Sequence, residues 1–339
     1  RTGQSPGFLV GGILKNFGKS YQLGSGDYFV VEGDEYDSAF FDKKAKFLHY
    51  HPQILILNAV EFDHADIYKD LDAVMAAFSE LIQKMAPSGL IVADGSNANV
   101  KKLLTQAPCR VMTFGLEEKV GVQNFEPLLR ATKIEFGEKT RFQFSHGDKE
   151  LGVVTTPLAG RHNLKNLLGV IGVLLELGIP LTEINAALAE FQGVKRRQEE
   201  LGTIDGVTVI DDFAHHPTAV RETLAALRSK YRGRLWAIFE PRSNTTRRKV
   251  FEKDFATAFD DADEIIFAAP YLPEKIPQEE RLEPVQVVEA MKKRGKKARY
   301  LPSVEEIVRV VLEEKKSGDV ICIMSNGGFG GIHAKLLQK

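Results

Sequence analysis

The sequence has few cysteines, no excess of charge of either sign and no long apolar run. Cys109 and Cys322 lie far apart and form no CxxC pair, so we expect neither a disulfide framework nor a thiolate zinc site, and the compartment is expected to be reducing. The 45 Lys and Arg residues against 46 Asp and Glu leave a net charge of −1, which gives no general attraction for nucleic acid or an anionic membrane. Apolar stretches such as residues 167–175 are too short to cross a bilayer. Any anionic ligand therefore needs a local site.

The length and the hydrophobic content indicate a two-domain globular protein. At roughly 150 residues per domain, 339 residues suggest two domains, and a hydrophobic content of 43% can build a substantial core. From Tyr28 onward, short apolar runs alternate with helical patterns, which is typical of parallel strands joined by helices. We predict the α/β class, with two domains that each contain a mainly parallel sheet flanked by helices. The chain begins at Arg1 without a signal region, and we expect an N-terminal segment to be missing.

The strand and helix pattern also predicts the domain boundary. In the first domain the predicted strands are residues 28–31, 54–57, 90–93 and 110–114, and the predicted helices are 69–85, 162–177 and 181–191. Residues 125–156 predict a small antiparallel patch within this domain. In the second domain the predicted strands are 207–210, 235–239, 264–268, 298–301 and 320–324, with helices at 218–230, from about 246, at 284–293 and at 303–315. A polar segment near residue 192 separates the two halves, so the predicted domains are 1–195 and 196–339.

Two strand ends of the first domain carry candidate metal ligands. The segment EGDEYD, which begins at Glu32, holds four carboxylates in six residues, whose repulsion a cation would offset. The next strand is followed by NAVEFDHAD, which contains His64. If these strands are neighbours, Glu32 and His64 share a Mg²⁺ ion, since oxygen ligands suit that cation. An exposed acidic loop and a structural His–Asp pair are the alternatives.

The start of the helix near residue 162 is a candidate adenine site. Asn163 and Asn166 lie about one turn apart on one face, and His162 precedes them. A side-chain amide offers both the donor and the acceptor that a purine edge requires. The alternative is that Asn163 only caps the helix.

In the second domain, DDFAHHPT connects a strand to a helix that begins near Pro217. Neighbouring residues of an extended segment point to opposite sides. We therefore expect Asp212 and His215 to face a ligand, and Asp211 and His216 to support them. A metal site that uses all four residues, as in a phosphohydrolase, is the alternative.

Two further strand ends of this domain suit an anionic substrate. EPRSNT supplies Arg242, Ser243 and Asn244, and an arginine can bind a carboxylate or a phosphate bidentately. MSNGGFGG contains Asn326 and glycines that let backbone N–H groups approach an anion at a helix start. Solvated basic residues at a helix start and a tight glycine turn are the respective alternatives.

Together these motifs resemble the Mur ligase family. The resemblance rests on EGDEYDSAFFDKK, NAVEFDHADIY, DDFAHHPTA, EPRSNT and MSNGGFGGIHAKLL, which extend from residue 32 almost to the C-terminus. It implies an ATP-dependent ligase of the bacterial cytoplasm that joins L-Ala-γ-D-Glu-meso-diaminopimelate to UDP-N-acetylmuramate by way of an acyl phosphate, in peptidoglycan recycling. The implied partners are these two substrates, with no nucleic acid or membrane, and the implied state is a monomer or weak dimer.

The resemblance also implies a role for each candidate. Glu32 and His64 would hold Mg²⁺. His162, Asn163 and Asn166 would contact adenine. The ATP ribose or phosphates would be contacted by Arg197, Asp212 and His215. The residues that receive the incoming peptide would be Arg242, Ser243, Asn244 and Asn326.

One departure from the family pattern bears on activity. No GxxxxGK[ST] string occurs in the sequence, although the family has such a phosphate-binding loop. The N-terminal domain that binds UDP is absent as well, so we expect the chain as written to be inactive alone. The alternatives are a UDP-N-acetylmuramate:L-alanine ligase, a metal-dependent phosphohydrolase and a nucleotide-binding module without catalysis.

Overall fold

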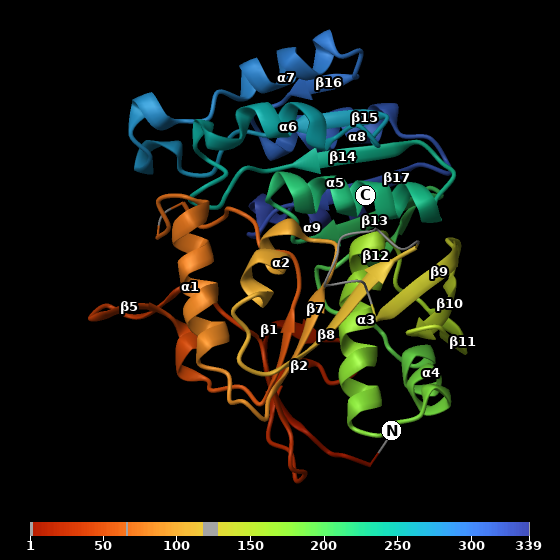
Figure 1. Ribbon diagram of the computed structural model, residues 1–339. Coiled ribbons are helices and arrows are strands. Elements are labelled where there is room, and N and C mark those ends of the chain that lie inside the picture. The colour runs from red at the N-terminus through yellow and green to blue at the C-terminus, as the bar shows by residue number, and fades with distance from the viewer. Residues whose placement is uncertain (1–2, 66, 118–127, 339) are drawn as a thin grey trace. The chain divides into compact units, whose positions relative to one another are not determined.

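The computed structural model describes residues 3–65, 67–117 and 128–338. The chain divides into two compact units between Gln192 and Gly193 (Figure 1). Each unit is built on a six-stranded, mostly parallel sheet with helices on both faces. The predicted fold class is confirmed.

The sheet of unit 1 has the order β11-β10-β9-β8-β7-β6. Its parallel part consists of β6 (Ile54–Leu57), β7 (Leu90–Asp94), β8 (Arg110–Leu116) and β9 (Leu129–Glu135). The antiparallel strands β10 (Thr140–His146) and β11 (Lys149–Thr156) extend the same sheet. Apolar residues pack α1 (Leu71–Gln83) and α2 (Ala98–Leu104) on one face and α3 (Arg161–Glu176) and α4 (Leu181–Ala189) on the other. The predicted antiparallel patch is therefore an extension of the main sheet.

Strands between Gly7 and Ala45 form two small sheets. One contains β1 (Gly7–Leu14), β2 (Lys19–Gln22) and β3 (Phe29–Val31), and the other contains β4 (Asp37–Ala39) and β5 (Asp42–Ala45). A short 3-10 helix, η1 (Lys46–His49), follows. The prediction that β3 and β6 are neighbouring strands is wrong, because β3 pairs in parallel with β1 in a separate sheet. A strand of three residues does not encode its partner in its side-chain pattern.

The sheet of unit 2 has the order β12-β13-β17-β14-β15-β16. Its strands are β12 (Glu199–Ile204), β13 (Val207–Asp212), β14 (Leu235–Phe239), β15 (Glu264–Phe267), β16 (Ala298–Tyr300) and β17 (Val320–Met324). Only β12, at the edge, is antiparallel to its neighbour.

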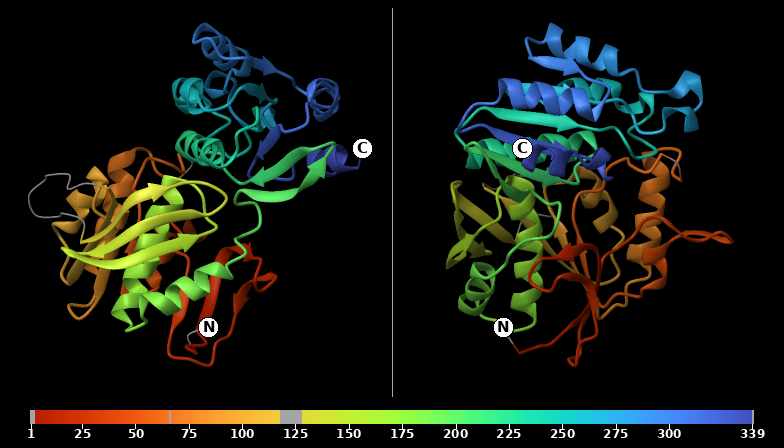
Figure 2. Two further views of the ribbon diagram at one scale, coloured as in Figure 1. Left: turned by 90° about the vertical axis from the view of Figure 1, so that its right-hand side faces the viewer. Right: turned by 180° about the vertical axis from the view of Figure 1, so that it is seen from behind.

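Helices cover both faces of this sheet (Figure 1, Figure 2). One face is covered by α5 (Pro217–Lys230), α6 (Glu252–Ala258) and α7 (Pro284–Lys293), and the other by α8 (Val304–Glu314) and α9 (Ile332–Leu337). The 3-10 helices are η2 (Lys249–Phe251), η3 (Pro273–Lys275), η4 (Gln278–Glu280) and η5 (Phe329–Gly331). The helix predicted from about residue 246 instead begins at Glu252, because Ser243 Oγ accepts the N–H of Thr246 and holds the backbone in a turn.

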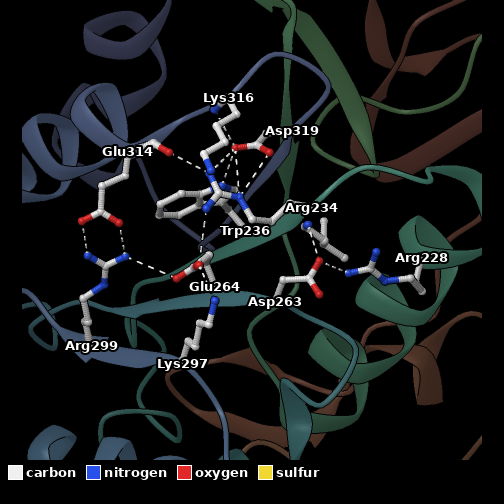
Figure 3. A network of polar contacts seen from close by, with 11 residues as sticks. Arg228, Arg234, Trp236, Asp263, Glu264, Lys297, Arg299, Glu314, Lys316 and Asp319 are labelled. Atoms are coloured by element: carbon white, nitrogen blue, oxygen red, sulfur yellow. Dashed lines mark hydrogen bonds and ion pairs between the residues drawn. The ribbon is translucent and has the colours of Figure 1, made fainter.

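A polar network closes the amino-terminal end of the unit 2 sheet (Figure 3). Asp319, directly before β17, accepts hydrogen bonds from Arg234 Nη2 at 2.7 Å and from Trp236 Nε1 at 3.0 Å. Glu264, the first residue of β15, is buried and forms ion pairs with Arg234, Lys297 and Arg299. These charges satisfy one another, so this end of the sheet is structural. In open parallel sheets ligands collect at the opposite, carboxyl ends.

The two cysteines lie in different environments. Cys109 in unit 1 is partly buried, whereas Cys322 is fully buried in the centre of β17. Both thiols are free, and burial raises the pKa of each. Among the described residues, no helix combines the length and the apolar character needed to cross a membrane.

Candidate functional site

The carboxyl ends of three adjacent strands bring the predicted unit 2 residues to one edge. Asp212 of β13 is in register with Met324 of β17, and Phe239 of β14 is in register with the same methionine. Asn326 lies two residues after the end of β17, and Arg242 lies three residues after the end of β14. The order of the strands therefore places three motifs that are distant in sequence side by side.

The position of the Arg242 side chain at this edge is set by contacts with Tyr271 and Glu240. Its guanidinium carbon lies 3.5 Å from the centroid of the Tyr271 ring. Its Nη1 lies 3.5 Å from Glu240 Oε2, and Glu240 is buried, with its Oε2 accepting a hydrogen bond from Ser325 Oγ at 2.6 Å. The long contact to Glu240 is its one hydrogen bond within the described residues, so most of its N–H groups are available to a ligand.

Ser243 and Asn244 shape the turn after Arg242. Ser243 Oγ accepts the N–H of Thr246 at 3.1 Å, and Asn244 Oδ1 accepts a hydrogen bond from Arg247 Nη2 at 3.1 Å. Arg247 was not among the sequence candidates. Burial lowers the pKa of Arg247, and the charges of nearby Arg248 and Arg242 lower it further. Three arginines thus lie close together at this turn, although Arg242 and Arg248 each form an ion pair with a glutamate.

Asn326 presents a buried acceptor beside this turn. Its Oδ1 is shielded from solvent and has no hydrogen-bond partner within the part of the chain that the structure describes. An unsatisfied buried polar atom typically costs about 1–3 kcal/mol. A ligand N–H group would remove this cost, which makes Asn326 a candidate contact for an amine.

The carboxylate of Asp212 is hydrogen-bonded to backbone groups of its own chain. Asp212 is 3% exposed, and its carboxylate accepts hydrogen bonds from the N–H groups of Gln198 at 2.7 Å and Ala214 at 2.8 Å. His215 Nδ1 lies 3.0 Å from the carbonyl oxygen of Phe213, which fixes its ring. Contact of either residue with ATP stays a prediction. His216 caps α5 by accepting the N–H of Thr218 through Nδ1.

The segment that enters unit 2 contacts the same edge. The guanidinium of Arg197 lies 5.5 Å from the Phe213 ring centroid. Arg196, which the sequence did not single out, donates to Asp211 and to the carbonyl oxygens of Ser325 and Gly327. Arg196 therefore braces the loop that carries Asn326.

The candidate adenine residues lie at the start of α3 in unit 1. Asn163 Nδ2 donates to the carbonyl oxygen of Ala159 at 2.8 Å, and Asn166 Oδ1 accepts from Asn58 Nδ2 at 3.0 Å. His162 lies in the same first turn. The capping alternative for Asn163 is wrong, because Gly160 occupies the N-cap position with a φ of 94°. The adenine role itself stays a prediction.

Sequence reasoning missed an ion pair beside this turn. Lys165 Nζ donates to Asp94 Oδ2 at 3.0 Å and to Ser96 Oγ at 2.8 Å, and Asp94 is 1% exposed. The available signal was the acidic residue that ends the apolar run of β7 at its carboxyl end.

Glu32 and His64, the predicted Mg²⁺ ligands, contact different residues in the structure. Glu32 Oε2 accepts the N–H of Gly11 at 2.5 Å, whereas His64 Nε2 contacts Glu35 Oε1 at 2.6 Å. Within the described ranges, no three His, Cys, Asp or Glu side chains are grouped so that they could hold a metal ion. A Mg²⁺ ion commonly takes only one or two protein ligands beside water and phosphate oxygens, so this finding does not exclude the pair. The role of Glu32 and His64 in holding Mg²⁺ stays a prediction, although strand β3, which precedes Glu32, lies outside the main sheet.

Comparison with known proteins identifies the family. The chain is 38% identical, over 340 residues, to the UDP-N-acetylmuramate–L-alanyl-γ-D-glutamyl-meso-2,6-diaminoheptandioate ligase of Escherichia coli (strain K12). The alignment covers 100% of this chain and 70% of that protein. The chain belongs to the Mur ligase family. Residues 16–174 match the Mur ligase middle domain, and residues 196–327 match the Mur ligase glutamate ligase domain.

Two further Mur ligases show the breadth of the match. The UDP-N-acetylmuramate–L-alanine ligase of Desulfitobacterium hafniense is 32% identical over 96% of this chain and 70% of its own length. The crystal structure of a murein peptide ligase from Psychrobacter arcticus gives a TM-score of 0.67 at 32% identity, covering 98% of this chain and 71% of that one. Mur ligases are ATP-dependent ligases, and this chain is a member of that class.

Proposed function

We propose that the chain carries the middle and C-terminal domains of a ligase that joins L-Ala-γ-D-Glu-meso-diaminopimelate to UDP-N-acetylmuramate, in peptidoglycan recycling in the bacterial cytoplasm. The observation that carries the proposal is the presence of both Arg242 and Asn326 at the carboxyl edge of one sheet. A cation and an unpartnered acceptor suit a substrate that brings both a carboxylate and an amine. The identity of 38% to the Escherichia coli enzyme of that name supports the same substrate.

The proposed reaction has two steps. A carboxylate oxygen of UDP-N-acetylmuramate attacks the γ-phosphorus of ATP, and ADP leaves. The amine nitrogen of the peptide then attacks the acyl carbon, phosphate leaves, and the nitrogen loses a proton. Such steps depend mainly on positioning and on neutralisation of charge.

Each unit contributes its own residues to this proposal. In residues 1–195 the proposed adenine contacts are His162, Asn163 and Asn166. In residues 196–339 the proposed ATP contacts are Arg197, Asp212 and His215, and the proposed peptide contacts are Arg242, Ser243, Asn244 and Asn326. ATP enters as its complex with a divalent cation such as Mg²⁺, for which Glu32 and His64 are the proposed ligands.

The second candidate is a UDP-N-acetylmuramate:L-alanine ligase, which the match to the Desulfitobacterium hafniense enzyme favours. The test uses the complete protein that the gene encodes, including any residues upstream of Arg1. Phosphate release is measured with ATP, Mg²⁺, UDP-N-acetylmuramate and either the tripeptide or L-alanine. We expect release with the tripeptide. Release with L-alanine alone would contradict the proposal.

A further inference from the structure

The guanidinium group of Arg242 is enclosed on two sides. The Tyr271 ring lies against it, with 3.5 Å between the guanidinium carbon and the ring centroid. Gly327 lies at a second side, where a Cβ atom would be only 1.8 Å from Arg242 Nε. The guanidinium therefore occupies the space that a side chain at position 327 would fill.

Backbone contacts fix the Tyr271 wall. The N–H of Tyr271 donates to the carbonyl oxygen of Pro241 at 2.9 Å, next to Arg242 in the chain. Arg247 Nη1 donates to the carbonyl oxygens of Tyr271 at 3.1 Å and Leu272 at 3.0 Å. The ring is thus tied to the same turn that carries Arg242, although about 30 residues separate the two in sequence.

Side-chain contacts fix the Gly327 wall. Ser325 Oγ donates to Glu240 Oε2 at 2.6 Å and accepts the N–H of Gly327 at 3.0 Å. Arg196 Nη2 donates to the carbonyl oxygen of Gly327 at 2.8 Å. Both peptide groups of this glycine are therefore held, and the backbone cannot move away to admit a side chain at low cost.

We propose that Tyr271 and Gly327 are positioning residues that hold the Arg242 guanidinium as a receptor for a carboxylate of the amine substrate. This inference rests on the proposed function. A guanidinium whose orientation is fixed before binding loses less rotamer entropy when it forms a bidentate pair. Tyr271 thereby contributes to substrate affinity through Arg242.

An arginine can bind a phosphate as well as a carboxylate. Two neighbours favour the carboxylate of a zwitterionic peptide. Buried Glu240 lies 3.5 Å from Arg242 and opposes a doubly charged phosphate, and the unpartnered Asn326 Oδ1 needs a donor, which a phosphate oxygen does not supply. The test therefore compares the KM for the tripeptide with the KM for ATP.

The first experiment compares Gly327→Ala with Gly137→Ala in the complete protein. Gly137 is the control, because it lies outside every candidate site, its φ is not in the left-handed region and an added Cβ would meet no atom closer than 3.7 Å. In Gly327→Ala the flexible end of Arg242 must leave its place. We expect the KM for the tripeptide to rise about tenfold or more, equivalent to about 1.4 kcal/mol, with little change in the KM for ATP. Gly137→Ala should match the unmodified protein.

The second experiment compares Tyr271→Phe with Tyr271→Leu. The phenylalanine ring keeps the stacking face and should retain the KM for the tripeptide, whereas leucine removes the face and should raise it. If Tyr271 had only a structural role, its substitution would lower the thermal midpoint, and the KM for the tripeptide would not depend on whether an aromatic ring is retained. The thermal midpoint of every variant is measured by Trp236 fluorescence.

The outcomes separate the inference from the proposed function. No tripeptide-dependent phosphate release by the unmodified protein would overturn both. An active unmodified protein whose Gly327→Ala and Tyr271→Leu variants keep the KM for the tripeptide would overturn the inference alone. A rise confined to the KM for ATP would also overturn it, because the bound anion would then be a phosphate.

Discussion

At the scale of single residues, Asp319 shows how one carboxylate stabilises the end of a sheet. Burial alone would raise its pKa, but hydrogen bonds from Arg234, from the N–H of Lys316 and from Trp236 lower the pKa below the ordinary value of 3.8. Because the folded-state pKa is the lower one, the stabilisation is present above about pH 4 and is lost as the pH falls below it. Asp319 therefore contributes to the acid sensitivity of unit 2.

We predict that Asp319→Asn lowers the free energy of unfolding of unit 2 at pH 7 by about 1–3 kcal/mol. The difference between the variant and the unmodified protein should shrink as the pH is lowered from about 5 to 3. Urea unfolding followed by Trp236 fluorescence measures both effects, since Trp236 is the one tryptophan of the sequence.

Asp148→Asn is the control for this measurement, because the Asp148 side chain is 98% exposed. It should leave the unfolding midpoint unchanged at every pH. A difference for Asp319→Asn that stays constant down to pH 3 would contradict the assigned pKa direction.

The site residues divide by what the sequence can encode. Arg242 and Asn326 follow clear apolar strands, so their place at the sheet edge was predictable. Tyr271 lies in a long connection after β15, and contacts of its backbone with Pro241 and Arg247 place it beside Arg242. The neighbour of the strand before Glu32 was predicted wrongly, because the sequence does not state which strand β3 pairs with.

At the scale of elements, α8 shows a helix whose start is specified locally. Ser303 Oγ accepts the N–H of Glu306, and Glu306 Oε2 accepts the N–H of Ser303, which is a capping box. The box satisfies the backbone N–H groups of Ser303 and Glu306 at the helix start. It also positions an acidic residue near the positive end of the helix dipole. The predicted start at residue 303 agrees with this geometry.

We predict that Ser303→Ala lowers the free energy of unfolding of unit 2 by about 1 kcal/mol. Ser317→Ala, in the exposed turn after α8, is the matched control and should have little effect. Both are measured by urea unfolding with Trp236 fluorescence. Equal destabilisation by the two variants would show that the cap is not responsible.

Elements without a strong periodic pattern escaped prediction. The helix α2 (Ala98–Leu104) has seven residues, which is too short to show a clear apolar periodicity. Strand β12 (Glu199–Ile204) is polar and lies at a sheet edge, so it resembled a linker in sequence. Strands with buried faces, such as β14 and β17, were predicted at their observed bounds because burial requires a continuous apolar run.

At the scale of the whole molecule, each unit has its own hydrophobic cores. The clusters around α3 belong entirely to unit 1, and those around α5 and α8 belong to unit 2. Separate cores allow separate cooperative unfolding. Far-UV circular dichroism reports on both units, whereas Trp236 fluorescence reports on unit 2.

We predict that Asp319→Asn and Leu168→Ala act on different transitions. Leu168 is fully buried in the core of unit 1, and its truncation typically costs about 2–5 kcal/mol. Leu168→Ala should move the unit 1 part of the circular dichroism transition to lower urea and leave the midpoint of the Trp236 fluorescence transition unchanged. Asp319→Asn should shift the fluorescence midpoint and the remaining dichroism change. Joint movement of both signals in both variants would contradict separate unfolding.

The contrast between the two thiols has a practical consequence for spectroscopy. A maleimide dye added to the native protein should attach at Cys109, since Cys322 is sealed inside β17. The protein thus offers a single labelling position in one half and a single indole emitter in the other. Energy transfer from Trp236 to a dye on Cys109 would report any change in their distance when a ligand binds, without an engineered cysteine.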